Sequence, residues 1–147
     1  ALGTMITAQA ADTLDGTVVS GTYKRSTNGG RRRGLKSPAG GAWEKLSDGT
    51  YKYHFAEGLE ATDYWLEIDG TWYYFGHDNI MQTGWVKDDG NWYYMDLETG
   101  ALFTGWHEIS GKWYYFHEEG DGFKGTLMVN CETPDGYTVD VNGALVE

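Results

Sequence analysis

The chain has 147 residues and a formal net charge of −11, and its 22 glycines outnumber 2 prolines. No apolar run approaches the roughly 20 residues that a membrane-spanning helix needs, so we expect no membrane insertion. Cys131 is the only cysteine, which excludes an internal disulfide and a thiolate metal cluster, and no metal or cofactor is expected.

Residues 1–41 are predicted to form a basic N-terminal segment. Up to residue 42 the chain has six basic and two acidic residues, a balance of +4, whereas the remainder has five and twenty, a balance of −15. Because the acidic body repels phosphates, a nucleic acid is not an expected partner. The asymmetry does predict weak homo-oligomer formation, with the basic segment of one copy on the acidic body of another.

Two features of this segment bear on targeting and folding. Ala8-Gln9-Ala10 resembles a signal-peptidase site, which fits the stub of a removed signal as well as an ordinary Ala-rich strand or terminus. Thr17–Tyr23 has the composition of a strand that pairs with the first hairpin or with the edge of another molecule.

A degenerate repeat unit is expected from residue 42. Trp43 and Tyr51 lie eight residues apart and flank the turn Asp48-Gly49. Pairing across that dipeptide sets Leu46 against Tyr51 and leaves Trp43 on the opposite face. This unit is therefore predicted to pack without forming an aromatic cage of its own.

Three further units each contain two tryptophans seven residues apart. The pairs recur at spacings of 20 and 21 residues and are Trp65/Trp72, Trp85/Trp92 and Trp106/Trp113. Each second tryptophan begins the triplet WYY, and each pair encloses Asp-Gly or Ser-Gly. These dipeptides favour the positive φ of two-residue hairpin turns, so each unit is predicted to be a β-hairpin.

Strand alternation predicts which side chains share a face of each hairpin. With Asp89-Gly90 as the turn, Trp85 pairs with Tyr94, and these rings share a face with Trp92. Tyr93 lies on the other face.

Successive hairpins are expected to stack, because an isolated two-stranded hairpin is marginally stable in water. The predicted fold is an all-β solenoid of stacked β-hairpin repeats of about 20–21 residues, preceded by the short N-terminal strand/loop segment. The repeats are expected over residues 42–126, and residues 127–147 are expected to form a C-terminal capping repeat.

The sequence resembles a known family in these units. TGWVKDDGNWYYMDLETGALF (Thr83 to Phe103) and TGWHEISGKWYYF (Thr104 to Phe116) are similar to the cell-wall-binding, or choline-binding, repeats of Gram-positive surface proteins. The resemblance is strong over residues 64–126, looser over 42–63 and 127–147, and absent before about residue 41. It implies a non-catalytic module that is secreted and acts at the cell surface.

The family's ligand is the choline of teichoic acid, held between successive hairpins by aromatic side chains from both. The ligand-binding residues that the resemblance implies are Trp65, Trp72, Trp85, Trp92, Tyr94, Trp106, Trp113 and Tyr115. The implied pockets are Trp65 and Trp72 with Trp92 or Tyr94, Trp85 and Trp92 with Trp113 or Tyr115, and Trp106 and Trp113 with Tyr137. Met81 and Met95 are candidates for the apolar side of a cage.

Two other interpretations of the aromatic residues stay open at this point. Related repeats bind glucans or glycans by stacking rings on sugars, and the polar residues that would hold the hydroxyls are Asp88, Asn91, Glu98 and Glu108. Stacked hairpins also need large side chains as a core, which is the interpretation preferred for the middle tyrosines Tyr73, Tyr93 and Tyr114. A quaternary ammonium has no hydrogen-bond donor and is recognised by π faces, each contributing about 0.5–2 kcal/mol.

No catalytic residues are expected. His107-Glu108 and His117-Glu118 resemble the start of an HExxH zinc motif, but Gly111 and Asp121 stand where the second histidine belongs.

Overall fold

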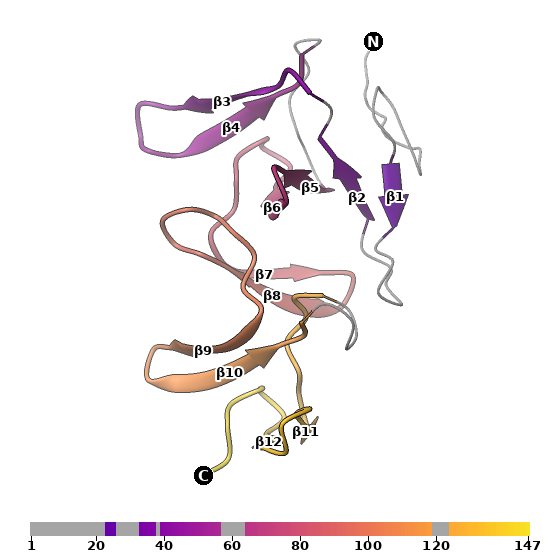
Figure 1. The fold of residues 1–147 in the computed structure, drawn as a ribbon. Coiled ribbons are helices and arrows are strands. Elements are labelled where there is room, and N and C mark those ends of the chain that lie inside the picture. Colours follow the sequence, from indigo (N-terminus) through magenta and orange to yellow (C-terminus); the bar gives the residue numbers. More distant parts are fainter. Residues whose placement is uncertain (1–22, 26–32, 38, 57–63, 119–123) are drawn as a thin grey trace.

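The computed structural model describes residues 23–25, 33–37, 39–56, 64–118 and 124–147 (Figure 1). The strands are β1 (Tyr23–Arg25), β2 (Arg33–Lys36), β3 (Ala42–Lys45), β4 (Tyr51–His54), β5 (Tyr64–Ile68), β6 (Thr71–Phe75), β7 (Gly84–Asp88), β8 (Asn91–Met95), β9 (Gly105–Ile109), β10 (Lys112–Phe116), β11 (Cys131–Glu132) and β12 (Thr138–Val139). Over these described ranges the chain forms no helix, and so no helix that could cross a membrane. The all-β prediction is confirmed.

The strands from β3 onward form five antiparallel hairpins, which follow one another along the molecule (Figure 1). The second hairpin, β5–β6, belongs to a four-stranded sheet of order β1-β2-β5-β6, in which β2 lies parallel to β5. The described strand β2 of the N-terminal segment therefore pairs with the second hairpin. The Ala8-Gln9-Ala10 run and residues 17–22 of the predicted strand lie outside the described residues.

The two-residue turns and the register of the three hairpins with tryptophan pairs are as predicted. Asp89 and Gly90 both have positive φ, 52° and 82°, as a type I′ turn requires. Trp85 pairs with Tyr94, and the equivalent pairs in the neighbouring hairpins are Trp65 with Tyr74 and Trp106 with Tyr115.

The predicted register of the first hairpin is wrong. Trp43 pairs with Tyr53, and the Leu46 N–H donates to the Thr50 carbonyl at 2.8 Å, closing a loop of three residues that ends in Gly49 at φ 91°. The extra residue of the Trp43 to Tyr51 spacing is thus absorbed in the turn. Trp43 therefore shares a face with Tyr53, in the position that Trp85 has beside Tyr94.

A backbone hydrogen bond ties each hairpin to the one before it. In the connection that follows a hairpin, one apolar residue forms a β-bridge with the end of that hairpin. The same residue donates its N–H to a backbone carbonyl of the preceding hairpin, that of the first aromatic residue in its second strand. The four donors and acceptors are Met81 to Tyr51 (2.9 Å), Leu102 to Trp72 (3.0 Å), Leu127 to Trp92 (2.8 Å) and Leu145 to Trp113 (2.8 Å). The recurrence of this bond makes the chain a stack of hairpins.

The core consists of apolar clusters at the interfaces between hairpins. Each interface buries side chains of two adjacent hairpins, as in the cluster of Trp65, Val86, Tyr93 and Met95. The Trp face of one hairpin therefore packs against the face of the next hairpin that carries the middle tyrosine.

We predict that Gly100→Ala lowers stability more than Gly90→Ala. Both glycines have positive φ, 78° and 82°, which costs an alanine about 1–2 kcal/mol. A Cβ at Gly100 would also collide with the Met81 side chain, whereas a Cβ at Gly90 meets nothing within 4 Å. Displacing Met81 should add roughly 1–3 kcal/mol.

Urea unfolding followed by tyrosine and tryptophan fluorescence measures the difference between these two variants. An equal loss of stability in both would contradict the packing of the Met81 connection against Gly100.

Candidate functional site

An open cavity of about 320 Å³ lies between the third and fourth hairpins and is called here the central cavity. It is lined by Trp85, Trp92, Tyr114, Leu127 and Asn142. Trp85 and Trp92 are 39% and 42% exposed, and their rings lie 6.1 Å apart at an interplanar angle of 89°. The Tyr114 ring is 5.1 Å from that of Trp85. Three rings thus converge on one space that solvent can enter.

The strands and the inter-hairpin hydrogen bond hold these rings in place. Trp85 and Trp92 come from the paired strands β7 and β8, and Tyr114 comes from β10 of the next hairpin. Leu127 is fixed beside them because its N–H bonds to the Trp92 carbonyl. The ammonium of Lys87 lies 5.7 Å from the Trp92 ring centroid, so this ring already has a cation as neighbour.

A second cavity, of about 400 Å³, lies between the fourth and fifth hairpins and is called the C-terminal cavity. Its lining residues are Trp106, Trp113, Asp135, Tyr137 and Leu145. The Tyr137 ring is perpendicular to that of Trp106 at 5.8 Å, and the Trp106 indole Nε1 donates to Asp135 Oδ2 at 2.9 Å. Tyr137 is the partner that the sequence offered for this tryptophan pair, and the structure brings the three rings together.

The Asp135 carboxylate gives the C-terminal cavity a negative wall. The Thr133 hydroxyl donates to Asp135 Oδ1 at 2.6 Å, and this bond, followed by that from Trp106, lowers the pKa of the carboxyl below its ordinary value. Neither of the two cavities has a basic residue in its lining.

The pair Trp65 and Trp72 is placed differently from the other two pairs. Trp65 is only 1% exposed, packs at 4.6 Å against the Tyr93 ring, and donates from its indole Nε1 to Asp88 Oδ2 at 2.9 Å. Trp65, one of the two tryptophans predicted to line the first pocket, therefore lies in the core. Trp72 is half-buried and packs against the same cluster.

The third ring of the central cavity differs from the one that the family resemblance suggested. Neither Trp113 nor Tyr115 lines the central cavity, where Tyr114 supplies the ring. The reason is the stacking direction, since a hairpin turns its middle-tyrosine face toward the preceding hairpin. Tyr114 lines the central cavity and also packs against the cluster of Tyr94, Ile109 and Phe116.

The remaining residues of the predicted cages lie in the interior. Tyr94 and Tyr115 are buried beside Trp85 and Trp106, with ring centroids 5.1 and 5.2 Å away. Met81 and Met95 are buried in the core and line neither cavity.

The first hairpin repeats the ring arrangement of the central cavity, which the sequence analysis missed. Trp43 is 38% exposed, and its ring lies 6.2 Å from Tyr51 and 5.0 Å from Tyr73. The corresponding ring distances in the central cavity are 6.1 Å from Trp85 to Trp92 and 5.1 Å from Trp85 to Tyr114. The eight-residue spacing of Trp43 and Tyr51 would have indicated this arrangement if it had been interpreted as a hairpin with a three-residue turn.

The comparisons with known proteins agree with this geometry. A family model of the choline-binding repeat matches residues 61–104 and 103–134. The choline-binding domain of Spr1274 from Streptococcus pneumoniae is 38% identical over 59% of this chain and 96% of that chain, with a TM-score of 0.51. No curated protein sequence matches.

Two longer structures from the same organism are also similar. Choline binding protein F, solved with a peptidoglycan analogue, is 29% identical at a TM-score of 0.51, over 86% of this chain and 44% of that one. CbpJ of strain TIGR4 is 28% identical at a TM-score of 0.50, over 88% and 46%. The chain spans less than half of either. Because the family model spans residues 61–134, half of the chain, the protein belongs to the choline-binding repeat family.

Proposed function

We propose that this protein is a non-catalytic module that is secreted and binds the choline of cell-wall teichoic acid at the bacterial surface. The observation that carries the proposal is the central cavity, where two exposed indoles at right angles meet a tyrosine of the next hairpin. Perpendicular rings surround a rounded trimethylammonium group on several sides. A flat sugar ring could stack on only one of them, which favours choline over a glycan.

The C-terminal cavity is proposed to bind the same group through Trp106, Trp113 and Tyr137. Its Asp135 carboxylate adds an attractive charge that the central cavity lacks. The rings around Trp43 are proposed as a third cage. The interface at Trp65 and Trp72 is proposed to serve packing, because Trp65 is buried.

The expected affinity of one cavity is modest. Three rings at about 0.5–2 kcal/mol each give roughly 1.5–6 kcal/mol of attraction, part of which offsets the entropy lost on binding. A dissociation constant near 1 mM corresponds to about −4.1 kcal/mol, which lies in this range. Several such cavities on a polymer that displays repeated choline groups would bind together far more tightly than one alone.

We predict that Trp92→Ala removes one choline site and leaves the C-terminal cavity functional. Calorimetric titration with choline should show at least two sites in the parent protein and one fewer in the variant, because Trp92 lines only the central cavity. Asn91→Ala is the matched control, since Asn91 precedes Trp92 in β8 and lines neither cavity.

The outcomes of this titration separate the two ligand classes. Loss of a choline site in Trp92→Ala alone supports the cage. If choline does not bind while a soluble glycan binds and depends on Trp92, the rings are sugar platforms and the proposal fails.

We predict that Tyr114→Phe keeps choline binding whereas Tyr114→Leu weakens it about 2- to 30-fold at the central cavity. Phenylalanine preserves the π face opposite Trp85, and leucine removes one ring worth about 0.5–2 kcal/mol. Titration in a background that combines Trp43→Ala and Trp113→Ala isolates the central cavity from the other two proposed cages. Equal weakening by both substitutions would show that the hydroxyl matters and not the π face.

We predict an acid dependence of the C-terminal cavity that Asp135→Asn abolishes. Hydrogen bonds from Thr133 and Trp106 lower the pKa of Asp135. Its carboxylate is therefore charged at every pH above the ordinary aspartate pKa, and it loses its charge only as the pH falls through the lowered pKa. Choline affinity in a background that combines Trp43→Ala and Trp92→Ala should therefore be constant near neutral pH and fall in strong acid. The same decline in Asp135→Asn would assign it to another group.

A further inference from the structure

A charged residue lies opposite the first aromatic residue in the second strand of each of the first four hairpins, and its sign alternates along the stack. The four pairs are Lys45 with Tyr51, Glu67 with Trp72, Lys87 with Trp92 and Glu108 with Trp113. Because directly opposite residues share a face of a hairpin, each charge lies on the face that carries the tryptophan. The aromatic cages therefore differ in the charge beside their rings.

A lysine accompanies the central cavity and the proposed cage of Trp43. The Lys87 ammonium lies 5.7 Å from the centroid of the Trp92 ring, and the Lys45 ammonium lies 5.9 Å from that of Tyr51. Both lysines are exposed and form no ion pair with another described residue. Each of these rings thus already has one cation beside it, and that cation repels a second one in the cage. An anionic group on the ligand would offset this repulsion.

The lining of the central cavity also offers a hydrogen-bond donor. Asn142 is exposed, and it is the only residue of this lining with a side-chain amide. Its backbone N–H donates to Asp140 Oδ1 at 2.9 Å, whereas its side-chain amide makes no hydrogen bond with the other described residues. An amide N–H donates to phosphate oxygens as it does to other acceptors. The central cavity therefore has a donor in its lining and a cation beside it.

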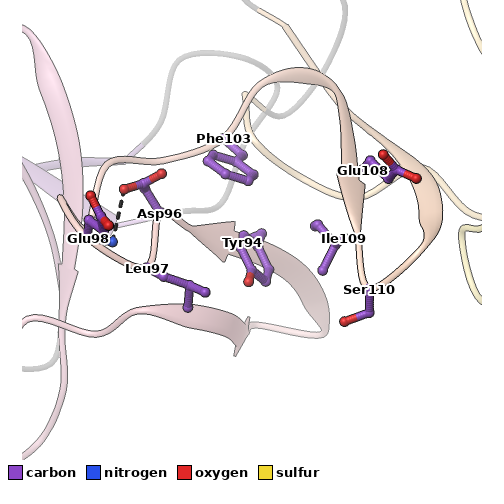
Figure 2. A pocket seen from close by; sticks show the side chains of 8 residues that line it. All are labelled: Tyr94, Asp96, Leu97, Glu98, Phe103, Glu108, Ile109 and Ser110. Atoms are coloured by element: carbon purple, nitrogen blue, oxygen red, sulfur yellow. Dashed lines mark hydrogen bonds between the residues drawn. The ribbon is translucent and has the colours of Figure 1, made fainter.

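The C-terminal cavity has the opposite surroundings. Glu108 lies opposite Trp113, and the Asp135 carboxylate lines the cavity. Figure 2, which views the pocket on the other face of β9, shows the Glu108 carboxylate directed away from the Ile109 side chain. Glu108 is exposed and forms no ion pair with another described residue. Two carboxylates there attract a trimethylammonium group and repel a phosphate attached to it.

We propose that Lys87 makes the central cavity selective for choline that carries its phosphate, whereas Glu108 and Asp135 make the C-terminal cavity selective for choline without one. The inference rests on the proposed function, since it requires that the rings hold the trimethylammonium group. In phosphocholine a two-carbon linker joins that group to the phosphate, and the flexible lysine side chain follows the phosphate. The Asn142 amide donates to the same phosphate, and Lys45 has the role of Lys87 beside Trp43.

The test compares choline with phosphocholine by calorimetric titration of the full chain, in the two backgrounds that leave one cage intact. Trp43→Ala with Trp113→Ala leaves the central cavity, and Trp43→Ala with Trp92→Ala leaves the C-terminal cavity. The measured quantity is the ratio of the two dissociation constants at each cavity. We expect the central cavity to favour phosphocholine and the C-terminal cavity to favour choline, with ratios that differ at least about threefold.

One substitution in each background identifies the residue responsible. Lys87→Gln should weaken phosphocholine binding roughly two- to fivefold and strengthen choline binding, because it removes an attraction and a repulsion together. Glu108→Gln should do the reverse at the C-terminal cavity. A role in packing alone would change the affinity for both ligands in the same direction. Lys52→Gln removes a positive charge from β4 of the first hairpin and is the matched control, which should leave both ratios unchanged.

Vesicles of phosphatidylcholine distinguish two sources of the phosphocholine group. Vesicle binding that Lys87→Gln weakens assigns the group to a lipid, and binding of soluble phosphocholine that depends on Lys87 without vesicle binding assigns it to a wall polymer. Either result supports the selectivity.

Equal ratios at the two cavities, or ratios that neither Lys87→Gln nor Glu108→Gln changes, overturn this proposal while choline binding itself stands. Failure of both ligands to bind contradicts the proposed function, and the selectivity with it.

Discussion

The structure depends on one backbone hydrogen bond that recurs between neighbouring hairpins. A single hairpin of two strands of at most five residues each cannot bury both of its aromatic faces alone. The bond runs from Met81, Leu102, Leu127 or Leu145 to the carbonyl of the first aromatic residue in the preceding hairpin's second strand, and it fixes how closely the next unit approaches. It also sets an apolar side chain beside that aromatic residue. The spacing of the rings, and hence the cavities, follows from this bond.

Each cavity is an interface where stacking leaves the tryptophan pair partly uncovered. The same sequence unit gives a closed interface at Trp65, whose strand β5 has β2 paired along its outer edge, with Gly34 opposite Trp65. Trp85 belongs to a two-stranded hairpin and stays exposed. The repeat motif itself is therefore compatible with both a buried and an exposed tryptophan pair.

Much of the fold was predictable because turn chemistry and strand alternation are local. Asp89-Gly90 alone determined the register of β7 and β8, whereas Asp48-Gly49 misled because a three-residue loop also ends in glycine at positive φ. The third ring of a cage could not be derived from one hairpin, since Tyr114 reaches the central cavity only through the stacking direction.

The measurement that tests the central claim most directly compares choline with 3,3-dimethylbutan-1-ol, its neutral analogue of the same shape, by calorimetric titration. Both fill an apolar space equally well, but only choline is attracted by π faces. The account predicts that choline binds at two or more sites and the neutral alcohol at least about tenfold more weakly, a difference of about 1.4 kcal/mol. Equal affinities would reduce the cavities to apolar hollows, and no binding of choline at all would contradict the cation cages.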